Sequence, residues 1–412
     1  MVMRKRDSVV VALDIGTTKV CALVAEITRE NRIKLLGTGT SPSHGLKKGV
    51  VINIEETVDS IKNAIREAGK TAGIEIKGVY TGIAGSHISG INSRGVVPIK
   101  NQEVTINDIE KAIETARAVT IPPDKEILHV IPQEFIVDGQ NGIKNPLGIS
   151  GVRLEVQVHI ITGGITSVQN IVKSINKAGL EVMDIMLQPL ASSEAVLTQD
   201  EKDLGVVMID IGGGTTDLAI FTNGAIAHTA VIPVGGNHVT NDIAIGLSTP
   251  ASEAEKIKIQ YGCAMRSLLN GNSAIEVASV GGRPPHQVSQ HTIAEIIELR
   301  ADEIFRLALN EIKKVQHVST ISSGIVITGG TSSLNGITDV AEKITGMPVR
   351  RGVPLSIEGL SDTFRHPMYA TGIGILNSAI LQGMEDKRLI DGTMFENIFY
   401  RMRNWFGGFF NF

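Results

Sequence analysis

The sequence predicts an α/β protein built from two similar halves. Two segments carry this prediction, VVVALDIGTTKVCALVAEI (9–27) and GVVMIDIGGGTTDLAIF (205–221). In each, an apolar run reaches Asp-Ile-Gly, turns through small and hydroxyl residues and continues as a second apolar run, the pattern of a β-hairpin with a polar tip. The two aspartates, Asp14 and Asp210, are 196 residues apart, about half of the 412-residue chain. Strand-like and helix-like segments alternate in most of the remaining sequence, which is typical of α/β folds. A cleft between the halves would face both tips.

The elements between and after these hairpins follow from hydrophobic periodicity. Val58, Ile61 and Ile65 share one helical face, so a helix is expected over 57–68. The same reasoning predicts strands at 78–85, 181–187 and 325–328, and helices at 168–177, at 188–197 and after the Gly329-Gly330 turn.

The pattern changes between residues 84 and 163. A capping box at Thr105 and Asp108 predicts a helix to about Val119. Two long alternating segments, 126–139 and 153–161, predict strands with one face on a core and the other toward solvent. We expect an inserted subdomain with one layer of helix on a sheet.

Composition limits the classes of function. A chain of 43.9 kDa exceeds what one core usually organises, so two or more domains are expected. The formal net charge of −4 gives no overall attraction to nucleic acid, and we expect no nucleic-acid partner. Cys21 and Cys263 form neither a disulfide framework nor a metal motif, which favours a reducing cytosol. The early apolar run 9–13 is short, and no stretch approaches the roughly 20 apolar residues of a membrane span, so neither export nor membrane crossing is expected.

Both hairpin tips have the composition of phosphate-binding loops, because glycine lets backbone N–H groups approach phosphate oxygens. The predicted phosphate-binding residues are Gly16, Thr17, Thr18, Lys19, Gly212, Gly213, Gly214, Thr215 and Thr216. Asp14 and Asp210, just before the tips, are placed to hold a hydrated Mg²⁺. One such loop alone is as often a structural turn as a binding site, and Thr216 and Asp217 could equally be structural residues of the hairpin. Two matched loops in one chain favour phosphate binding.

Further residues are predicted to bind the nucleoside. These are Gly235, Gly236, Asn237, Glu255, Lys258, Gly329, Gly330, Thr331 and Ser332. Glu255 and Lys258 are spaced i, i+3 on one helical face, where both could reach ribose hydroxyls, although such a pair is more often a surface ion pair. The tips match neither a P-loop nor a Rossmann fingerprint, since a strand follows each of them.

The last eighteen residues, FENIFYRMRNWFGGFFNF, hold eight of the fifteen aromatic residues. On a helix, six apolar side chains fall within an arc of about 120°. These are Phe395, Ile398, Phe399, Met402, Trp405 and Phe406, followed by a second apolar patch at Phe409, Phe410 and Phe412. Tyr400 is the one aromatic off this face. The polar segment before Phe395 resembles a linker. A membrane-targeting amphipathic helix is therefore favoured over a helix that packs on the core or in a protein groove.

Five segments, DIGTTK, QPLASS, DIGGGTTD, TGGTSS and ATGIG, resemble in order the nucleotide-site segments of the actin, heat-shock chaperone and sugar kinase superfamily. Within it, SHGLKKGVV, HVIPQEF, GIKNPLGISGVRLEV, VGGRPP and the aromatic tail resemble the FtsA family of bacterial cell-division proteins, over nearly the whole chain. The resemblance implies an actin-like two-lobed ATPase fold with duplicated halves, an inserted α+β subdomain and a C-terminal amphipathic helix.

The resemblance also implies a domain division. The first-half core would comprise 1–83, 164–195 and 360–381, the inserted FtsA-type subdomain 84–163, the second-half core 196–231 and 318–359, the small subdomain of the second half 232–317, the linker 382–394 and the membrane-targeting helix 395–412.

For function, the resemblance implies ATP and Mg²⁺ in the cleft and self-association into actin-like filaments. The small subdomain would bind the acidic C-terminal peptide of the tubulin-like protein FtsZ, with Arg300 on that surface. Arg300 is equally consistent with an exposed helical arginine that balances Glu298 and Glu303. Through membrane lipids, the tail would anchor the Z ring to the cytoplasmic face of the inner membrane at the septum, and 84–163 would help recruit later division proteins.

The same resemblance places Gln188 where the superfamily orients the attacking water, and Gln188 and Asp210 are the candidate catalytic residues. At most a slow ATPase linked to assembly is expected, and turnover itself is left open. Two alternatives are an actin-like adaptor of a pilus or secretion machine, and a sugar or acetate kinase of the superfamily, although no acceptor-site base is evident for a kinase.

Overall fold

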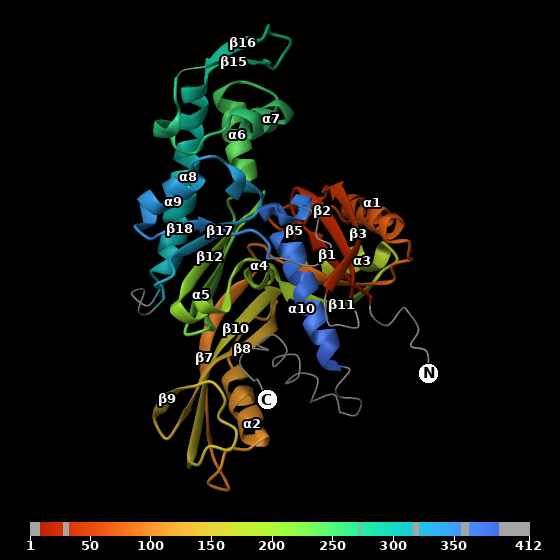
Figure 1. Cartoon of the computed structure of the whole chain (residues 1–412). Coiled ribbons are helices and arrows are strands. Elements are labelled where there is room, and N and C mark those ends of the chain that lie inside the picture. The colour runs from red at the N-terminus through yellow and green to blue at the C-terminus, as the bar shows by residue number, and fades with distance from the viewer. Residues whose placement is uncertain (1–8, 28–32, 272, 316–320, 356–361, 387–412) are drawn as a thin grey trace.

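The computed structural model describes residues 9–27, 33–271, 273–315, 321–355 and 362–386 (Figure 1). Within these ranges, two five-stranded sheets form the body of the molecule. The first contains β1 (Val9–Ile15), β2 (Lys19–Ile27), β3 (Ile33–Pro42), β6 (Gly78–Ile83) and β11 (Glu181–Leu187). The second contains β12 (Val206–Ile211), β13 (Thr216–Thr222), β14 (Ala225–Ile232), β17 (Ile325–Thr328) and β18 (Val349–Arg351).

The two sheets have the same topology. Their strand orders are β3-β2-β1-β6-β11 and β14-β13-β12-β17-β18, and in each the first three strands are antiparallel and the last two join in parallel. The hairpin turns also match. The N–H of Gly16 donates to the carbonyl of Lys19 at 3.0 Å, and that of Gly212 to Thr215 at 2.9 Å. The predicted duplication of two halves is therefore confirmed.

Helices cover both faces of each sheet. On the first sheet, α1 (Ile54–Ala72) and α3 (Ile165–Lys177) pack on one face, and α10 (Ala370–Asp386) on the other. The short α4 (Gln188–Val196) shares its buried residues with both halves, because one apolar cluster joins it to α10, β1 and β12. The expected helices at 57–68, 168–177 and 188–197 correspond to α1, α3 and α4, with α1 longer at both ends.

The packing of α10 on α4 depends on one glycine. A Cβ on Gly374 would lie 1.7 Å from the carbonyl oxygen of Ala191, so no other residue fits there without moving a helix. This close approach fixes α10 between the two halves, where Figure 1 shows it in blue.

The other face of the second sheet carries a helical layer and a small β-hairpin. Its elements are α6 (Gly236–Gly246), α7 (Ala251–Tyr261), η1 (Arg266–Leu268), β15 (Ala274–Val277), β16 (His286–Ser289), α8 (Gln290–Ile312) and α9 (Ile337–Thr345). The remaining short elements of the body are β4 (Leu46–Lys47), β5 (Val50–Val51), α5 (Gln199–Leu204), η3 (Gly330–Ser333), η4 (Asp362–Arg365) and η5 (Pro367–Tyr369). The turn after β17 is thus a 3-10 turn, and the expected helix begins only at Ile337.

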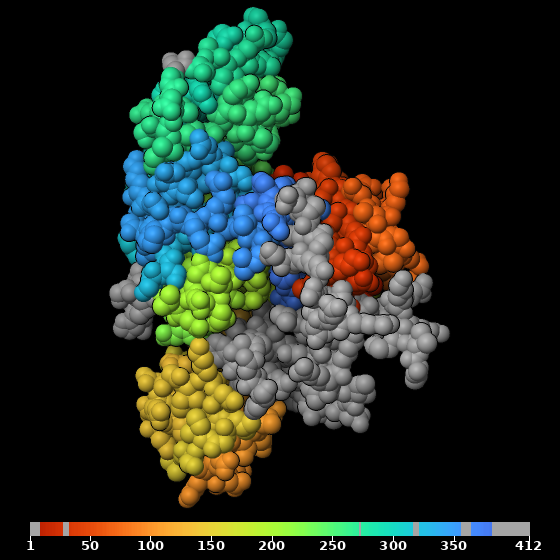
Figure 2. Space-filling view, in the orientation of Figure 1, coloured from red at the N-terminus to blue at the C-terminus, as the bar shows by residue number. Residues whose placement is uncertain are grey.

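An inserted unit follows β6 and projects from the body, in yellow and orange in Figure 2. It consists of β7 (Ser89–Pro98), α2 (Ile106–Arg117), β8 (Lys125–Val137), β9 (Gln140–Ile143) and β10 (Arg153–Gly164), with sheet order β7-β10-β8-β9. The capping box of Thr105 and Asp108 is formed as predicted, and α2 covers one face of the sheet. The insertion expected from the sequence is confirmed as an α+β unit.

The expectation that the second face of this sheet points to solvent is wrong for β10. Glu155 and His159 are each only 1% exposed. His159 lies against β14 of the second half, where its Nε2 is 2.8 Å from Oγ1 of Thr229, and Glu155 is covered by ion pairs with Arg94 and Arg153. Alternation along a strand identifies two faces, but it does not show that a neighbouring sheet will cover the polar one.

The C-terminal predictions fall at the limit of the described residues. The helix α10 continues through Asp386, so residues 382–386 of the expected linker are helical. The remaining linker and the expected membrane-targeting residues from Phe395 to Phe410 lie outside the described ranges. Among the helices of those ranges, none is both long and apolar enough to cross a bilayer.

Candidate functional site

A cavity of about 710 Å³ lies between the two halves, at the tips of both hairpins. Its wall includes Asp14, Gly16, Thr17, Thr18, Lys19, Gln188, Asp210, Gly212, Gly213, Gly214, Thr215, Gly236, Asn237, Glu255, Lys258, Gly329, Gly330 and Thr331. Segments more than 300 residues apart in sequence therefore meet around one space, as the sequence predicts for the two loops and the third glycine turn.

The two hairpin tips touch each other. A Cβ on Gly213 would lie 2.0 Å from Oγ1 of Thr18, and one on Gly214 would lie 2.5 Å from Oγ1 of Thr17. The backbone of the second tip can approach the first only because it lacks side chains. Oγ1 of Thr17 also accepts a hydrogen bond of 3.3 Å from the N–H of Gly49. Backbone groups and hydroxyls from both halves thus line one end of the cavity.

Three buried aspartates line the cavity, Asp14, Asp210 and Asp217, and the first two directly precede the hairpin tips. Burial raises the pKa of Asp14 to about 6, with Lys19 opposing and Asp210 adding to the shift. Burial likewise raises the pKa of Asp210, although Ser192 and Thr371 donate hydrogen bonds of 2.6 and 3.2 Å to its Oδ2. Two desolvated carboxylates whose charge is poorly compensated would be stabilised by a cation.

The donor set fits a hydrated magnesium ion. Oxygen ligands suit Mg²⁺, which keeps several waters and needs only one or two protein carboxylates. In the described residues no group of three or more His, Cys, Asp or Glu side chains is arranged to hold a metal directly. Asp14 and Asp210 are therefore the residues that would hold Mg²⁺ through its waters.

Gln188 lies at the start of α4 beside the first carboxylate. Its Nε2 donates to Oδ1 of Asp14 at 3.4 Å. This contact orients the side chain, and the amide oxygen remains available to accept a hydrogen bond from a water in the cavity.

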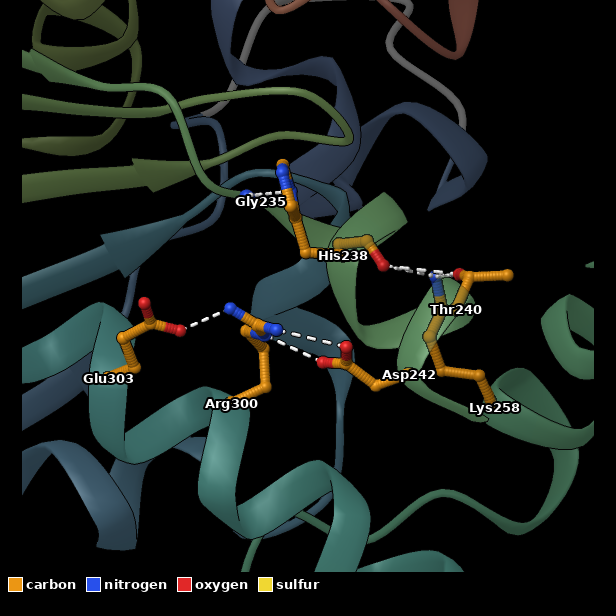
Figure 3. A network of polar contacts seen from close by, with 8 residues as sticks. Gly235, His238, Thr240, Asp242, Lys258, Arg300 and Glu303 are labelled. Atoms are coloured by element: carbon orange, nitrogen blue, oxygen red, sulfur yellow. Dashed lines mark hydrogen bonds and ion pairs between the residues drawn. The ribbon is translucent and has the colours of Figure 1, made fainter. Parts of the chain in front are cut away.

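Lys258 is tied into the wall of the cavity. Its ammonium lies between α7 and α6, where it donates to Oγ1 of Thr240 at 2.9 Å (Figure 3). It also donates to the carbonyl of Gly236 at 3.3 Å and to Oε2 of Glu255 at 2.6 Å. All three of its protons are used, and the side chain is only 10% exposed. Glu255 is more exposed and faces the cavity, so the pair joins two helices and presents its carboxylate, not its ammonium, to a ligand.

Four predicted residues do not line the cavity. Thr216 donates to the carbonyl of Val234 at 2.8 Å and Ser332 to that of Gly329 at 2.7 Å, so both hydroxyls shape turns behind the wall. Gly235 packs on the backbone of the second tip. Arg300 lies on α8, where Nε and Nη2 donate to Asp242 of α6 at 2.6 and 2.9 Å and Nη1 pairs with Glu303 (Figure 3). Its guanidinium already has two carboxylate partners.

The cavity wall also contains residues that the sequence did not single out. These include Tyr261, Asn335, His366 and Met368. Tyr261 is the last residue of α7, and the other three come from loops and short turns without periodicity. The nearest signal to His366 and Met368 in the sequence is the ATGIG segment that starts directly after Tyr369.

Comparison with known proteins gives a consistent result. The family model described as "Cell division protein FtsA" matches residues 207–374, and "SHS2 domain inserted in FTSA" matches 85–162. The chain is 48% identical to the cell division protein FtsA of Pseudomonas aeruginosa, over 97% of this chain and 98% of the relative. The FtsA proteins of Neisseria meningitidis and Escherichia coli are 50% and 43% identical, each over 92% of this chain and 91% of the relative.

Solved structures with similar folds have much lower identity. The "PilM-PilN type IV pilus biogenesis complex" matches with a TM-score of 0.64 and 17% identity, over 90% of this chain and 98% of that chain. MreB5 of Spiroplasma citri bound to ADP matches with a TM-score of 0.56 and 18% identity, over 92% and 99%. These likenesses show the fold, which is the predicted actin-like two-lobed architecture.

Proposed function

Because the chain belongs to the FtsA family of cell division proteins, we propose that it is an ATP-binding, actin-like adaptor that links the division ring to the membrane. The observation that carries this proposal is the cavity at which both hairpin tips, the third glycine turn and two buried carboxylates converge. A triphosphate brings negative charge, which backbone N–H groups and Lys19 can bind and which a cation held by Asp14 and Asp210 can bridge.

In this proposal each part of the wall has one task. The tips bind phosphate oxygens, Glu255 accepts a hydrogen bond from a ribose hydroxyl, and Gln188 orients a water near the phosphates. Mg²⁺, when bound, offsets the charge of the phosphates. The geometry requires no covalent step by the protein, which is consistent with slow hydrolysis linked to assembly and a nucleotide that mainly holds the two halves together.

We propose Arg300 as part of the docking surface for the acidic FtsZ peptide. Its two carboxylate partners show that an anionic group can be held there, and both lie at the surface of α6 and α8. A carboxylate of the peptide would replace either Asp242 or Glu303 as a partner of Arg300. An exchange of this kind predicts reversible binding that weakens with salt.

Membrane attachment is assigned to residues 395–412. Each large apolar side chain contributes roughly 1.5–3 kcal/mol in full transfer, and less at an interface, so a single tail binds reversibly. Filaments that carry many tails would gain about 10²–10⁴ in apparent affinity without new contacts. The tail would place the protein on the cytoplasmic face of the inner membrane at the septum, and the inserted unit would offer later division proteins a separate surface.

Binding of nucleotide is tested by titrating the full-length protein with fluorescent ADP and ATP, with and without Mg²⁺. Micromolar or tighter binding that Mg²⁺ strengthens is expected, and Asp14→Asn should remove the Mg²⁺ dependence. If the native protein and Asp14→Asn bind nucleotide equally well, with Mg²⁺ and with a chelator alike, the assignment of Asp14 and Asp210 to a magnesium site is wrong.

Membrane attachment is tested by pelleting with anionic vesicles in the presence of ATP. The full chain should pellet, and a chain ending at Asp386, which keeps α10 entire, should remain in the supernatant. Phe399→Glu and Tyr400→Glu form a matched pair, because the two residues are adjacent but only Phe399 belongs to the expected apolar face. Similar losses in both variants would contradict an amphipathic helix.

A further inference from the structure

The ammonium of Lys19 is held by a segment from the far end of the chain. Its Nζ donates to the carbonyl of Met368 at 2.6 Å and stands 3.6 Å from the centroid of the Tyr369 ring. Residues 19 and 368 are 349 positions apart. The lysine of the first hairpin tip is therefore placed by η5, which directly precedes α10.

Aromatic residues are scarce in the body of this protein, and two of them gather here. Before residue 395 the sequence has seven, namely Tyr80, Phe135, Phe221, Tyr261, Phe305, Phe364 and Tyr369. The rings of Phe364 and Tyr369 are 4.8 Å apart between centroids. Phe364 thus packs in a tilted arrangement against the ring that carries the lysine.

The same segment contacts the other two loops of the cavity. Nδ1 of His366 accepts a hydrogen bond of 3.3 Å from the N–H of Met368, so the proton of the neutral ring is on Nε2. Nε2 lies 3.2 Å from Oγ of Ser333 in the third glycine turn. Thr371 donates to Asp210 at 3.2 Å. Residues 366–371, here called the closing segment, therefore join all three loops.

An aromatic ring is suited to hold this ammonium. Asp14 and Asp210 both attract Lys19, and a flexible lysine could pair with either and so withdraw its charge from a ligand. The face of a ring attracts a cation without neutralising it. Contact with the ring of Tyr369 therefore leaves the ammonium of Lys19 available to an incoming anion.

We propose that Tyr369 is a positioning residue of this site, whose ring holds the ammonium of Lys19 at the cavity wall where the phosphates of a nucleotide arrive. The inference rests on the proposed nucleotide binding. Tyr369 itself touches no phosphate, because it acts through Lys19.

The test measures binding of fluorescent ADP to full-length Tyr369→Phe, Tyr369→Leu and Tyr369→Met. Phe keeps the ring and should bind within about twofold of the native protein. Leu and Met remove it and should weaken binding by about 5- to 30-fold, the range of a partly desolvated cation–π contact. Met preserves side-chain length, and thermal melting of all three variants checks the fold.

A double-mutant cycle with Lys19→Gln completes the test. If the ring acts through the lysine, Tyr369→Leu should have little further effect in the Lys19→Gln background. Equal binding by native protein and Tyr369→Leu overturns the inference, as does an equal loss in Tyr369→Phe. If the native protein itself binds neither ADP nor ATP, the proposed function fails instead.

Discussion

The hydroxyl of Ser192 donates a hydrogen bond of 2.6 Å to Oδ2 of Asp210, and this contact fixes β12, the first strand of the second hairpin, to α4. Ser192 is fully buried, and α4 also begins with Gln188 at the first carboxylate. One helix of nine residues therefore orients groups at Asp14 and Asp210, two of the three buried aspartates of the cavity wall.

Ser192→Ala should weaken Mg²⁺-dependent binding of nucleotide and destabilise the protein by about 1–3 kcal/mol, because it removes a donor from a buried carboxylate. Ser193→Ala is the matched control. Ser193 is equally buried in the same helix, but its hydroxyl donates to the carbonyl of Pro189. Urea unfolding and ADP titration in both variants measure the difference, and equal behaviour would contradict this role for Ser192.

Asp14 should make the ligand-free protein less stable as pH rises. Its pKa is raised from 3.8 to about 6 in the folded protein, which therefore binds this proton more tightly than the unfolded chain does. Its contribution to the free energy of unfolding is present below about pH 4 and is lost as pH rises through 6, a change of about 3 kcal/mol.

Asp14→Asn removes this titration. Without nucleotide, the variant should be more stable than the native protein at pH 7.5, and the difference should shrink at pH 5. Comparing the two proteins at each pH cancels the titration of buried histidines such as His129, whose lowered pKa acts in the opposite direction. Urea unfolding at both pH values is the measurement. A constant difference would show that Asp14 is not the titrating group.

Gly374→Ala should destabilise the protein by about 1–3 kcal/mol or more, because its Cβ would overlap the carbonyl of Ala191 in α4. Gly372→Ala lies on the same helix, and its one tight contact would be with a side-chain methyl, Cδ1 of Leu23 at 3.2 Å, since Cβ of Asp14 at 3.7 Å and Cγ of Leu23 at 3.8 Å are at ordinary van der Waals distance. Both changes replace glycine by alanine in the same helix and favour the helical conformation equally. The difference between their melting temperatures therefore measures the cost of the close contact between α10 and α4. Similar melting temperatures would mean that α10 and α4 can separate at little cost.

Lys258→Met should cost about 1–3 kcal/mol, because it removes two hydrogen bonds that join α7 to α6 and a third to Glu255 within α7. Lys256→Met provides the comparison. It breaks the i, i+3 pair with Glu253 on the same helix, where the lysine is 66% exposed, and should cost less than about 1 kcal/mol. Nucleotide affinity should fall only in Lys258→Met, since Glu255 then loses one of its two hydrogen-bond partners and keeps only Thr240. A fall in both variants would point to overall charge instead.

The sequence predicts the duplication well, because each hairpin is a local pattern of apolar runs and glycine. It also predicts which loops meet, since matched halves place equivalent turns face to face. The closing segment is different. His366, Met368 and Tyr369 have no periodicity or motif of their own, and their proximity to Lys19 depends on where α10 packs. The i, i+3 spacing of Glu255 and Lys258 identifies neighbours on α7, but only the position of α6 shows that the ammonium is buried.

The helix α10 has its first residues at the cavity and its last at Asp386, from which the chain continues toward the aromatic tail. Thr371, in its first turn, holds Asp210, and Gly374 seats it tightly against α4. A pulling force on the tail would therefore act along the axis of α10, whose first turn is hydrogen-bonded to Asp210. With the tail attached to a membrane as proposed, α10 would transmit a mechanical force from the membrane to the carboxylate beside the second hairpin tip.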